Sequence, residues 1–428
     1  MRKHLFSIAE VVAFIFIFWA SPSEAQVNWT KSPINPVLGP GTGWLSYGFP
    51  FVFVMKGNDT LRMWFSAAEG TTTGHDRIGY ATSTDGINFN MNASPVFEPS
   101  GGSAFDSEGV FGANVLYDGT VYRMWYNGYS TQPYYAGALE TGLATSGDGI
   151  NWTRHTGNPV LAKGPTGSWD EQWAYVNTVL FIDSTYRMWY TGSDQNGKCS
   201  VGYATSNDGI AWSKYSGNPV LAGKGGGWDV LNNQNARVIY HDGKYEMWYN
   251  GNPAQNADYD IGYATSSDGI NWVKYTSNPV MVTGGTGAFD EDWCWAPAVI
   301  YDESNYYMWY TGFSNNLYHV GFASDSTHTG LHPAKTHERE PLLVYPNPVS
   351  TTSTIKYYVD APGRVKVSVY DQVGREVLTL LDEYRQAGSY TLSLGTTGLR
   401  NGSYTCVLQY QDKTYRTNIA VTKLLVLH

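Results

Sequence analysis

The sequence is poor in the residues and motifs that metal chemistry and nucleic-acid binding require. Only three of its 428 residues are cysteines, and the spacing of Cys199, Cys294 and Cys406 suits neither a zinc site nor a disulfide framework. Acids outnumber lysine and arginine, and the net charge of −10 argues against a phosphate-binding surface. Phosphate-loop, metalloprotease, nucleophile-elbow and dinucleotide motifs are missing. We therefore expect no nucleic-acid partner, no cofactor and no metal.

Long apolar runs are also scarce, apart from one at the N-terminus. Basic residues at positions 2–4 precede an apolar run from Val11 to Ala20, which is too short to span a bilayer as a helix. The small-x-small sequence Ser23-Glu24-Ala25 follows, as before a cleavage site. This pattern predicts that residues 1–25 are a signal peptide; the alternative is an uncleaved anchor.

The most abundant feature is an internal repeat. Three landmarks recur about every 60 residues, a period that indicates stacked supersecondary units. They are Met-Trp-Tyr/Phe at Met63, Met124, Met188, Met247 and Met308; Gly-Tyr-Ala-Thr-Ser-x-Asp-Gly-Ile, as in residues 79–87; and Asn-Pro-Val at Asn35, Asn158, Asn218 and Asn278.

Each copy contains four short alternating segments separated by turn signals such as Asp-Gly. In the third copy these are 177–182, 186–192, 200–206 and a last strand from "AWSKYS" and "NPVLA". The fifth copy ends near residue 325 without its last strand, whereas residues 27–38 carry one with nothing but the leader before it. We predict an all-β fold in which residues 26–325 form a five-bladed β-propeller closed by this N-terminal strand, rather than an open solenoid.

A second domain follows the repeat. Residues 326–341 are polar and rich in charge, as in a linker, and residues 342–428 alternate like a small immunoglobulin-like β-sandwich. "YPNP" (345–348), "VYDQVGREV" (369–377) and "AGSY" (387–390) resemble the C-terminal sorting domain of the type IX secretion system. The resemblance implies the type IX machinery as a partner, with export across the outer membrane to a secreted or cell-surface location. An ordinary immunoglobulin-like accessory module is the alternative.

The repeat helps to distinguish structural residues from candidate functional residues. A residue type that recurs at the same position in most copies is expected to stabilise the blade. Asp106, Asp170, Asp229 and Asp290 share one column and are expected in turns or caps. Most of the 16 tryptophans repeat as well. The long connections between second and third strands and between blades share one end of the ring, where we expect the site. The remaining candidates for binding substrate there are Trp173, Trp293, Trp295, Asn232, Asn235, Arg237, Asp260 and His319.

The landmarks resemble those of the clan of five-bladed glycosidases, which includes arabinanases, levansucrases and invertases. This resemblance implies a carboxylic acid and a carboxylate at the channel mouth, acting on a polysaccharide or oligosaccharide. The catalytic candidates are Glu171 or Glu291 as the acid, with Glu108 or Asp292 as its partner. The first inner strand, within residues 46–54, lacks the acid that the family places there. We therefore carry two hypotheses for a monomeric protein, a glycoside hydrolase and a non-catalytic propeller that binds glycan or protein.

Overall fold

The computed structural model describes residues 28–325 and 342–426, except 58–59, 71–73, 134–135, 224–226, 256, 303–304, 346, 348, 360–362, 373–374, 387 and 413–416. The predicted signal peptide and linker lie outside the described residues. The chain divides into two compact units between Leu331 and His332. Among the described residues, no helix is long and apolar enough to cross a membrane.

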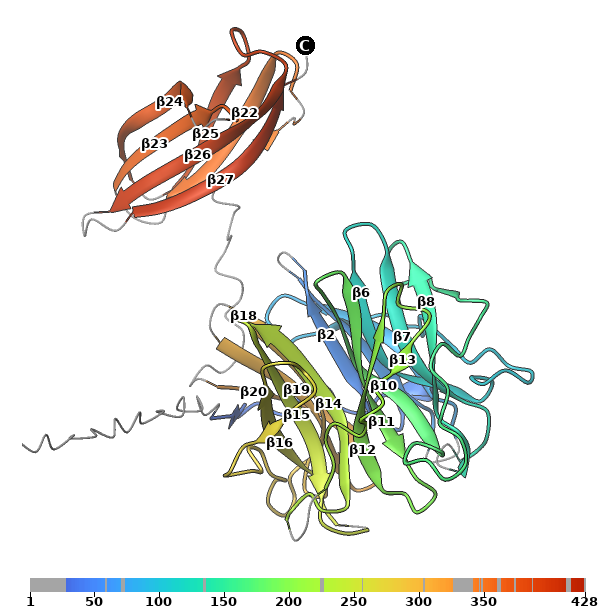
Figure 1. The fold of residues 1–428 in the computed structure, drawn as a ribbon. Helices are drawn as coiled ribbons and strands as arrows, with labels where there is room; N and C mark the ends of the chain where they lie inside the picture. The colour runs from blue at the N-terminus through green and yellow to red at the C-terminus, as the bar shows by residue number, and fades with distance from the viewer. Residues whose placement is uncertain are drawn as a thin grey trace, which may run out of the picture. The chain divides into compact units, whose positions relative to one another are not determined.

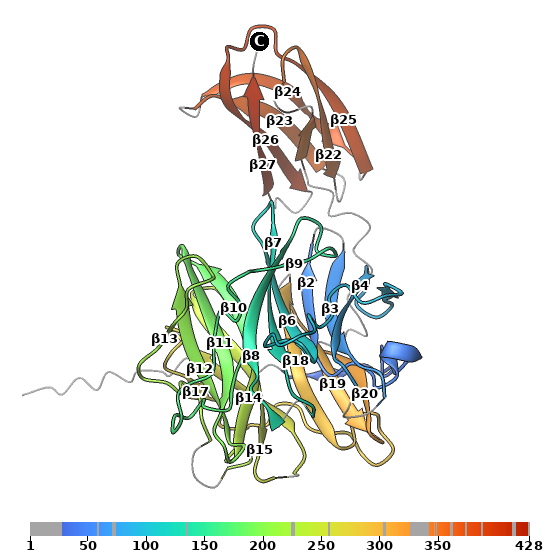
Figure 2. The same cartoon turned by 90° about the vertical axis from the view of Figure 1, so that its right-hand side faces the viewer.

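The first unit contains five antiparallel sheets of four strands each in its described part, and these are the five predicted blades (Figures 1 and 2). A short 3-10 helix, Gly43–Leu45, precedes the first blade. The strands are, in blade 1, β2 (Val52–Lys56), β3 (Leu61–Ala67), β4 (Arg77–Ser83) and β5 (Asn90–Met91); in blade 2, β6 (Gly109–Tyr117), β7 (Tyr122–Tyr129), β8 (Glu140–Ser146) and β9 (Thr153–Arg154); in blade 3, β10 (Trp173–Ile182), β11 (Thr185–Ser193), β12 (Cys199–Ser206) and β13 (Ser213–Lys214); in blade 4, β14 (Asn232–His241), β15 (Lys244–Asn252), β16 (Asp260–Ser266) and β17 (Val273–Lys274); in blade 5, β18 (Trp293–Asp302), β19 (Asn305–Ser314), β20 (Leu317–Ser324) and β1 (Thr30–Lys31).

The N-terminal strand closes the ring as predicted. β1 pairs antiparallel with β20, placing Thr30 opposite Ser324 and Lys31 opposite Ala323. Further along the chain, Leu38 bridges Val320. The fifth blade is therefore built from both ends of the propeller sequence, and its third strand is not left as an open edge.

The outermost strands are shorter than the sequence suggested. In the third blade only Ser213 and Lys214 pair with β12, and the predicted "NPVLA" segment adds a single bridge at Leu221. The side chain of Asn218 takes over the pairing, because its Oδ1 accepts from Tyr203 N (2.8 Å) and its Nδ2 donates to Tyr203 O (2.9 Å). Asn35, Asn158 and Asn278 make the same two bonds in their own blades. One amide thus replaces a backbone donor and acceptor ahead of a proline that has no N–H.

The repeated tryptophans connect each blade to the next. In four blades the fully buried Met-Trp-Tyr/Phe tryptophan donates Nε1–H to the glycine carbonyl of an Asp-Gly turn in the following blade, at 2.8–2.9 Å. In blade 4 the equivalent Trp248 Nε1 has no acceptor within the described residues. Its turn belongs to the fifth blade, where the chain is split.

The shared aspartates lie in turns, as predicted, and each also forms an ion pair. Asp170 is 4% exposed and accepts hydrogen bonds from Tyr190 Oη (3.2 Å) and Lys214 Nζ (2.7 Å). Asp106, Asp229 and Asp290 each have the equivalent tyrosine and cation in their own blades. Each aspartate therefore links the start of its blade to that blade's second and fourth strands.

The second unit is a β-sandwich, as predicted. Its described strands form a three-stranded sheet, β21-β22-β25, and a four-stranded sheet, β24-β23-β26-β27. Apolar side chains of both sheets share one core. The strand bounds are β21 (Leu342–Tyr345), β22 (Thr352–Val359), β23 (Gly363–Tyr370), β24 (Glu376–Arg385), β25 (Gly388–Gly395), β26 (Gly402–Asp412) and β27 (Thr417–Val426).

Candidate functional site

The inner strands β6, β10, β14 and β18 carry a β-bulge at the same level, a few residues from their start. Three bulges contain a residue with positive φ: Gly112 (61°), Asn235 (52°) and Ala296 (44°). A bulge redirects side chains and leaves backbone groups unpaired in the ladder. This level of the channel lies toward the end of the ring from which the inner strands begin, where the long connections attach.

A ring of polar side chains on the second strands satisfies these backbone groups from the neighbouring blade. Asn127 Oδ1 accepts from Val176 N (2.7 Å), and Asn250 Oδ1 accepts from Ala296 N (2.7 Å). Ser66, Thr191 and Thr311 occupy the same column and bond to the bulge or entry backbone of the next blade. The bulges are therefore fixed parts of the scaffold that hold the channel wall in shape.

Aromatic side chains gather around the start of the inner strands. Phe51 contacts Phe111 and Trp295, with ring centroids 5.2 and 4.9 Å apart, and Phe111 lies 5.9 Å from Tyr175. We call Phe51, Phe111, Tyr175 and Trp295 the aromatic arc. Next to it, Trp293 stacks on Phe313, with ring centroids 4.4 Å apart. Partly exposed aromatics packed against these clusters include Tyr47, Tyr259 and Trp173.

A cavity of about 40 Å³ adjoins the aromatic arc within the channel. Its polar lining comes from Asn127, Tyr175, Asn177, Asn235 and Arg237, and the rest is Phe51–Phe53, Gly112, Ala113, Val176 and Ala296–Ala298. None of these lining residues is an acid. Because glycoside hydrolysis requires two carboxyl groups, this cavity alone cannot carry it out.

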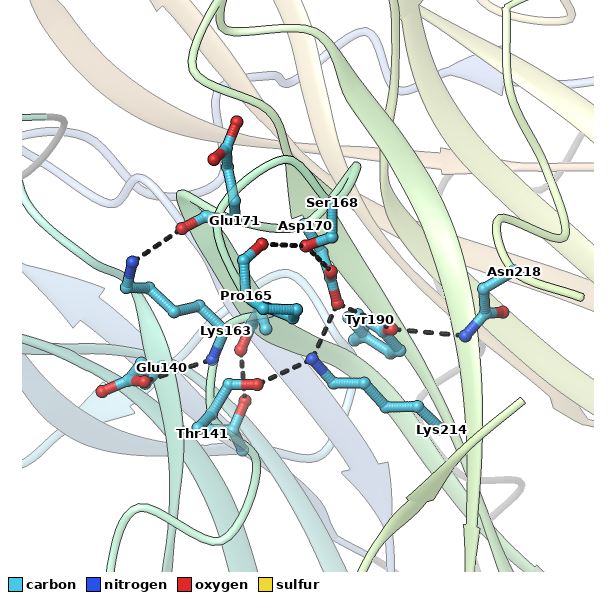
Figure 3. Close-up of polar contacts among 12 residues, drawn as sticks. Glu140, Thr141, Lys163, Pro165, Ser168, Asp170, Glu171, Tyr190, Lys214 and Asn218 are labelled. Carbon is cyan, nitrogen blue, oxygen red and sulfur yellow. Dashed lines mark hydrogen bonds and ion pairs between the residues drawn. The ribbon is translucent and has the colours of Figure 1, made fainter. Parts of the chain in front are cut away.

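The sequence-predicted acids Glu171 and Glu291 turn out to share a role in the entry turns of blades 3 and 5. Glu171 Oε2 accepts from Gly167 N (2.7 Å), and Glu291 Oε2 accepts from Gly287 N (2.8 Å). In Figure 3, Lys163 reaches the backbone oxygen of Glu171, while the Glu171 carboxylate points away from the Asp170–Lys214 pair. Within the described chain, no hydrogen bond joins either glutamate to Glu108 or Asp292.

The proposed partners lie apart from each other as well. Asp292 is exposed at the entry to blade 5, with its backbone N–H bonded to Phe313 O (3.0 Å). Glu108 is partly exposed at the entry to blade 2, and His75 Nδ1 lies 2.6 Å from its backbone oxygen and 3.6 Å from its Oε2. Glu108 is thus the candidate acid that the structure brings next to the connection between β3 and β4.

The predicted tryptophans differ in exposure. Trp295 is 7% exposed, packs in the aromatic arc, and its Nε1 has no partner within the described residues. Trp293 and Trp173 keep partial exposure, and Trp173 Nε1 donates to Gly137 O (3.2 Å). Of the three predicted tryptophans, Trp293 and Trp173 are therefore the more exposed.

The other predicted binding residues fall into two groups. Asn235 and Arg237 line the cavity, whereas Asn232 is buried and bonds to Cys199 N (2.9 Å) and Tyr259 Oη (3.1 Å). Asp260 and His319 lie on the third strands β16 and β20, two strands out from the channel. Neither residue lines the cavity.

Asp260 and His319 are also partly structural. The Asp260 Oδ1 atom accepts from Thr283 N (3.0 Å), and burial raises the pKa of this carboxyl. Glu140, in the same column of blade 2, accepts equivalently from Lys163 N (3.1 Å). Burial lowers the pKa of His319, whose Nδ1 has no partner within the described residues.

Asp76 was not selected as a site residue from the sequence, yet its carboxyl group has the most unusual pKa among the described acids of this end. Burial raises its pKa to about 7, although the hydrogen bond from Tyr129 Oη (2.9 Å) and the charges of His75 and Arg77 oppose the rise. Its backbone oxygen accepts from Val110 N (3.0 Å), next to Glu108. The available signal was its place on a long, non-repeated connection.

Among the described residues, neither metal-ligating side chains nor thiols form a further candidate site. No group of three His, Cys, Asp or Glu side chains in the described ranges is arranged to hold a metal ion. Cys199, Cys294 and Cys406 are buried free thiols, and burial raises the pKa of each. A thiol whose pKa is raised is a poor nucleophile at neutral pH.

Comparison with known families supports both parts of this architecture. Residues 343–422 match the model of the secretion system C-terminal sorting domain, and residues 113–230 match that of the glycosyl hydrolases family 32 N-terminal domain. An uncharacterized protein of Mycobacterium tuberculosis is 24% identical over 269 residues, which are 59% of this chain and 84% of that protein.

Solved structures agree at the level of fold. A glycosyl hydrolase from Bacteroides ovatus superposes with a TM-score of 0.57 at 20% identity, over 69% of this chain and 92% of that one. β-1,2-Mannobiose phosphorylase from Listeria innocua gives 0.54 at 16% identity, over 69% and 96%. The first unit therefore has the five-bladed propeller fold of glycosidases. The chain joins this fold to a type IX sorting domain, which indicates export across the outer membrane to a secreted or surface-attached state.

Proposed function

We propose that this chain is an exported carbohydrate-active protein that binds a glycan at the end of the propeller where the inner strands begin. The observation that carries the proposal is the group of partly exposed aromatic rings there, led by Trp293 on Phe313, in a fold shared with glycosidases. Aromatic rings offer flat apolar faces with polar edges, which suit the C–H faces and hydroxyls of sugars.

A binding assay tests this proposal. The purified chain is titrated with a panel of plant and microbial polysaccharides, beside Trp293→Ala and the control Phe181→Ala. Phe181 is 54% exposed and lies next to the β10–β11 turn, at the opposite end of the blade. We expect Trp293→Ala to weaken binding at least about tenfold, within the range of an aromatic hot spot, and Phe181→Ala to change nothing. Absence of binding to every glycan would refute the proposal.

Hydrolysis is a second candidate function, favoured by Asp76. A carboxyl group with a pKa of about 7 remains substantially protonated at neutral pH and can donate its proton to a leaving oxygen. Glu108, whose Oε2 lies 3.6 Å from His75 Nδ1, would supply the second carboxylate. A carboxylic acid and a carboxylate are the pair that glycoside hydrolysis requires.

Sugar release from the same panel, measured by mass spectrometry, tests catalysis. If Asp76 is the acid, release falls as the pH rises above about 7, and Asp76→Asn abolishes it while retaining glycan binding. Glu171→Gln and Glu291→Gln are measured in parallel, because loss of release in either variant would instead support the acids predicted from the sequence. Binding without release in the unaltered protein would rule out hydrolysis of the panel and leave a binding propeller.

A further inference from the structure

Arg237 is a partly buried cation that lines the cavity, with no anion beside it among the described residues. Its Nε donates to Val299 O (3.1 Å), and its Cζ lies 4.7 Å from the centroid of the Phe53 ring. Within the described residues it has no salt bridge, and no hydrogen-bond acceptor for its two terminal nitrogens. Burial alone lowers its pKa, to about 10, with no contribution from a nearby acid. The side chain is partly exposed, and it lines the cavity.

The equivalent positions in the other blades show that the scaffold does not need this charge. Phe53, Asn114, Thr178 and Ala298 share its column, each opposite the buried tryptophan of its blade. Asn114 and Thr178 also bond to the backbone of the next blade, as Arg237 does through Nε. A neutral amide or hydroxyl is therefore enough to bridge to the next blade, and the two terminal nitrogens of Arg237 are not needed for this bridge.

A partly buried guanidinium with no acid beside it favours an anion at its exposed end. A second donor lies in the same cavity wall. Asn177 Oδ1 accepts from Thr191 Oγ1 (2.7 Å), which fixes the amide, and its Nδ2 has no acceptor within the described residues. The cavity thus presents N–H donors from Arg237 and Asn177 and no acid.

We infer that this cavity binds a carboxylate group, carried by an acidic sugar unit such as a uronate. This inference rests on the proposed function. The planar guanidinium matches a carboxylate through parallel N–H bonds. The cavity volume of about 40 Å³ is enough to admit a carboxylate group.

Titration of the purified full-length chain with glucuronate and galacturonate oligosaccharides tests the inference, with their neutral glucose and galactose counterparts as controls. We expect the uronates to bind more tightly than the neutral sugars. Arg237→Gln should weaken uronate binding at least about tenfold, as expected for loss of a charge-assisted hydrogen bond. Asn114→Thr, which places the blade 3 residue in the same column of blade 2, should leave uronate binding unchanged.

Thermal unfolding supplies a second readout that does not depend on affinity. Without ligand, Arg237→Gln should unfold at the same temperature as the unaltered protein or higher, because it removes a partly buried charge that has no acid beside it. With glucuronate, the unaltered protein should gain stability and the variant should not. A large loss of stability in ligand-free Arg237→Gln would instead make Arg237 a structural bridge and overturn the inference.

The outcomes separate this inference from the proposed function. Binding of neutral and acidic glycans with equal affinity, unaffected by Arg237→Gln but lost in Trp293→Ala, would refute the carboxylate site and leave the glycan site standing. Binding of acetate at Arg237 without any uronate binding would refute the sugar assignment. Failure of every glycan to bind would refute both.

Discussion

Lys31 Nζ lies 2.6 Å from Asp290 Oδ2, although the two residues are 259 positions apart in the chain. Asp290 is almost fully buried and also accepts from Tyr310 Oη (3.0 Å). The same aspartate–cation pair occurs within blades 2, 3 and 4. In blade 5 alone, it connects the N-terminal strand to the last blade and so fastens the ring.

Substituting the lysine of this closing pair tests how much it stabilises the ring. Lys31→Met leaves Asp290 buried with only neutral partners, and we expect a loss of about 2–3 kcal/mol in the free energy of unfolding, since the lysine is partly exposed. Lys214→Met is the matched control, because its pair has similar burial but lies within a continuous blade. Urea unfolding should show a larger loss for Lys31→Met; equal losses would show that closure adds nothing to the pair.

We expect that replacing the asparagine of an Asn-Pro-Val segment with a charged residue destabilises the propeller. Asn218→Asp keeps an acceptor for Tyr203 N but removes the donor to Tyr203 O and Tyr190 Oη. We expect a loss of about 1–3 kcal/mol, because buried groups lose their partners. Exposed Ser216, two residues earlier, provides the control Ser216→Ala, which should be neutral. Unfolding in denaturant measures both, and an unchanged Asn218→Asp would contradict the strand-replacement role.

Stability should depend on pH through Glu246. Burial of this carboxylate alone would raise its pKa, but hydrogen bonds from Tyr263, Tyr306, Lys244 and His241 outweigh burial and lower the pKa. The resulting stability is present above the ordinary pKa of 4.5 and is lost as the pH falls through the lower folded value. Melting temperatures between pH 3 and 7 should fall more steeply in the unaltered protein than in Glu246→Gln.

Asp76 should have the opposite pH dependence. Its folded pKa of about 7 exceeds its ordinary value of 3.8, so its stabilising effect is present at low pH and is lost as the pH rises through 7. The stability of Asp76→Asn relative to the unaltered protein should therefore increase between pH 4 and 7 and then level off. Melting curves at four or five pH values measure this, and a constant difference would show that the carboxyl titrates normally.

The sorting domain should decide where the protein accumulates. Removing residues 342–428 takes away the region that matches the sorting-domain model, and we expect the protein to remain in the periplasm of a host with a type IX system. Immunoblots of periplasm and medium measure the distribution. The full-length chain in a strain without the translocon should accumulate in the same place, whereas export of the truncated chain would contradict the assignment.

Repetition made most of the architecture predictable from the sequence. The phase of the repeat placed residues 27–38 in the last blade, and the shared aspartate column indicated a structural role before any contact was known. The length of the outer strands was not predictable, because "NPVL" alternates like a strand although Asn218 pairs through its side chain.

The candidate site was less predictable, since its properties depend on what surrounds each side chain. Glu171 and Glu291 stood out as acids near inner strands, but only the folded turns show them bonded to Gly167 and Gly287. Asp76 carried no distinguishing motif, and its raised pKa comes from burial under residues far along the chain, such as Tyr129.

By itself, the sequence determined five blades, their closure and the export domain, because hydrophobic periodicity and turn residues are local and repeat in every copy. Only the tertiary structure decided that Arg237 lines a cavity without an acid in its lining and that the carboxyl group of Asp76 lies against Tyr129. The reason is physical: desolvation and the pairing of charges depend on distances between blades, and no local pattern of residues encodes those distances.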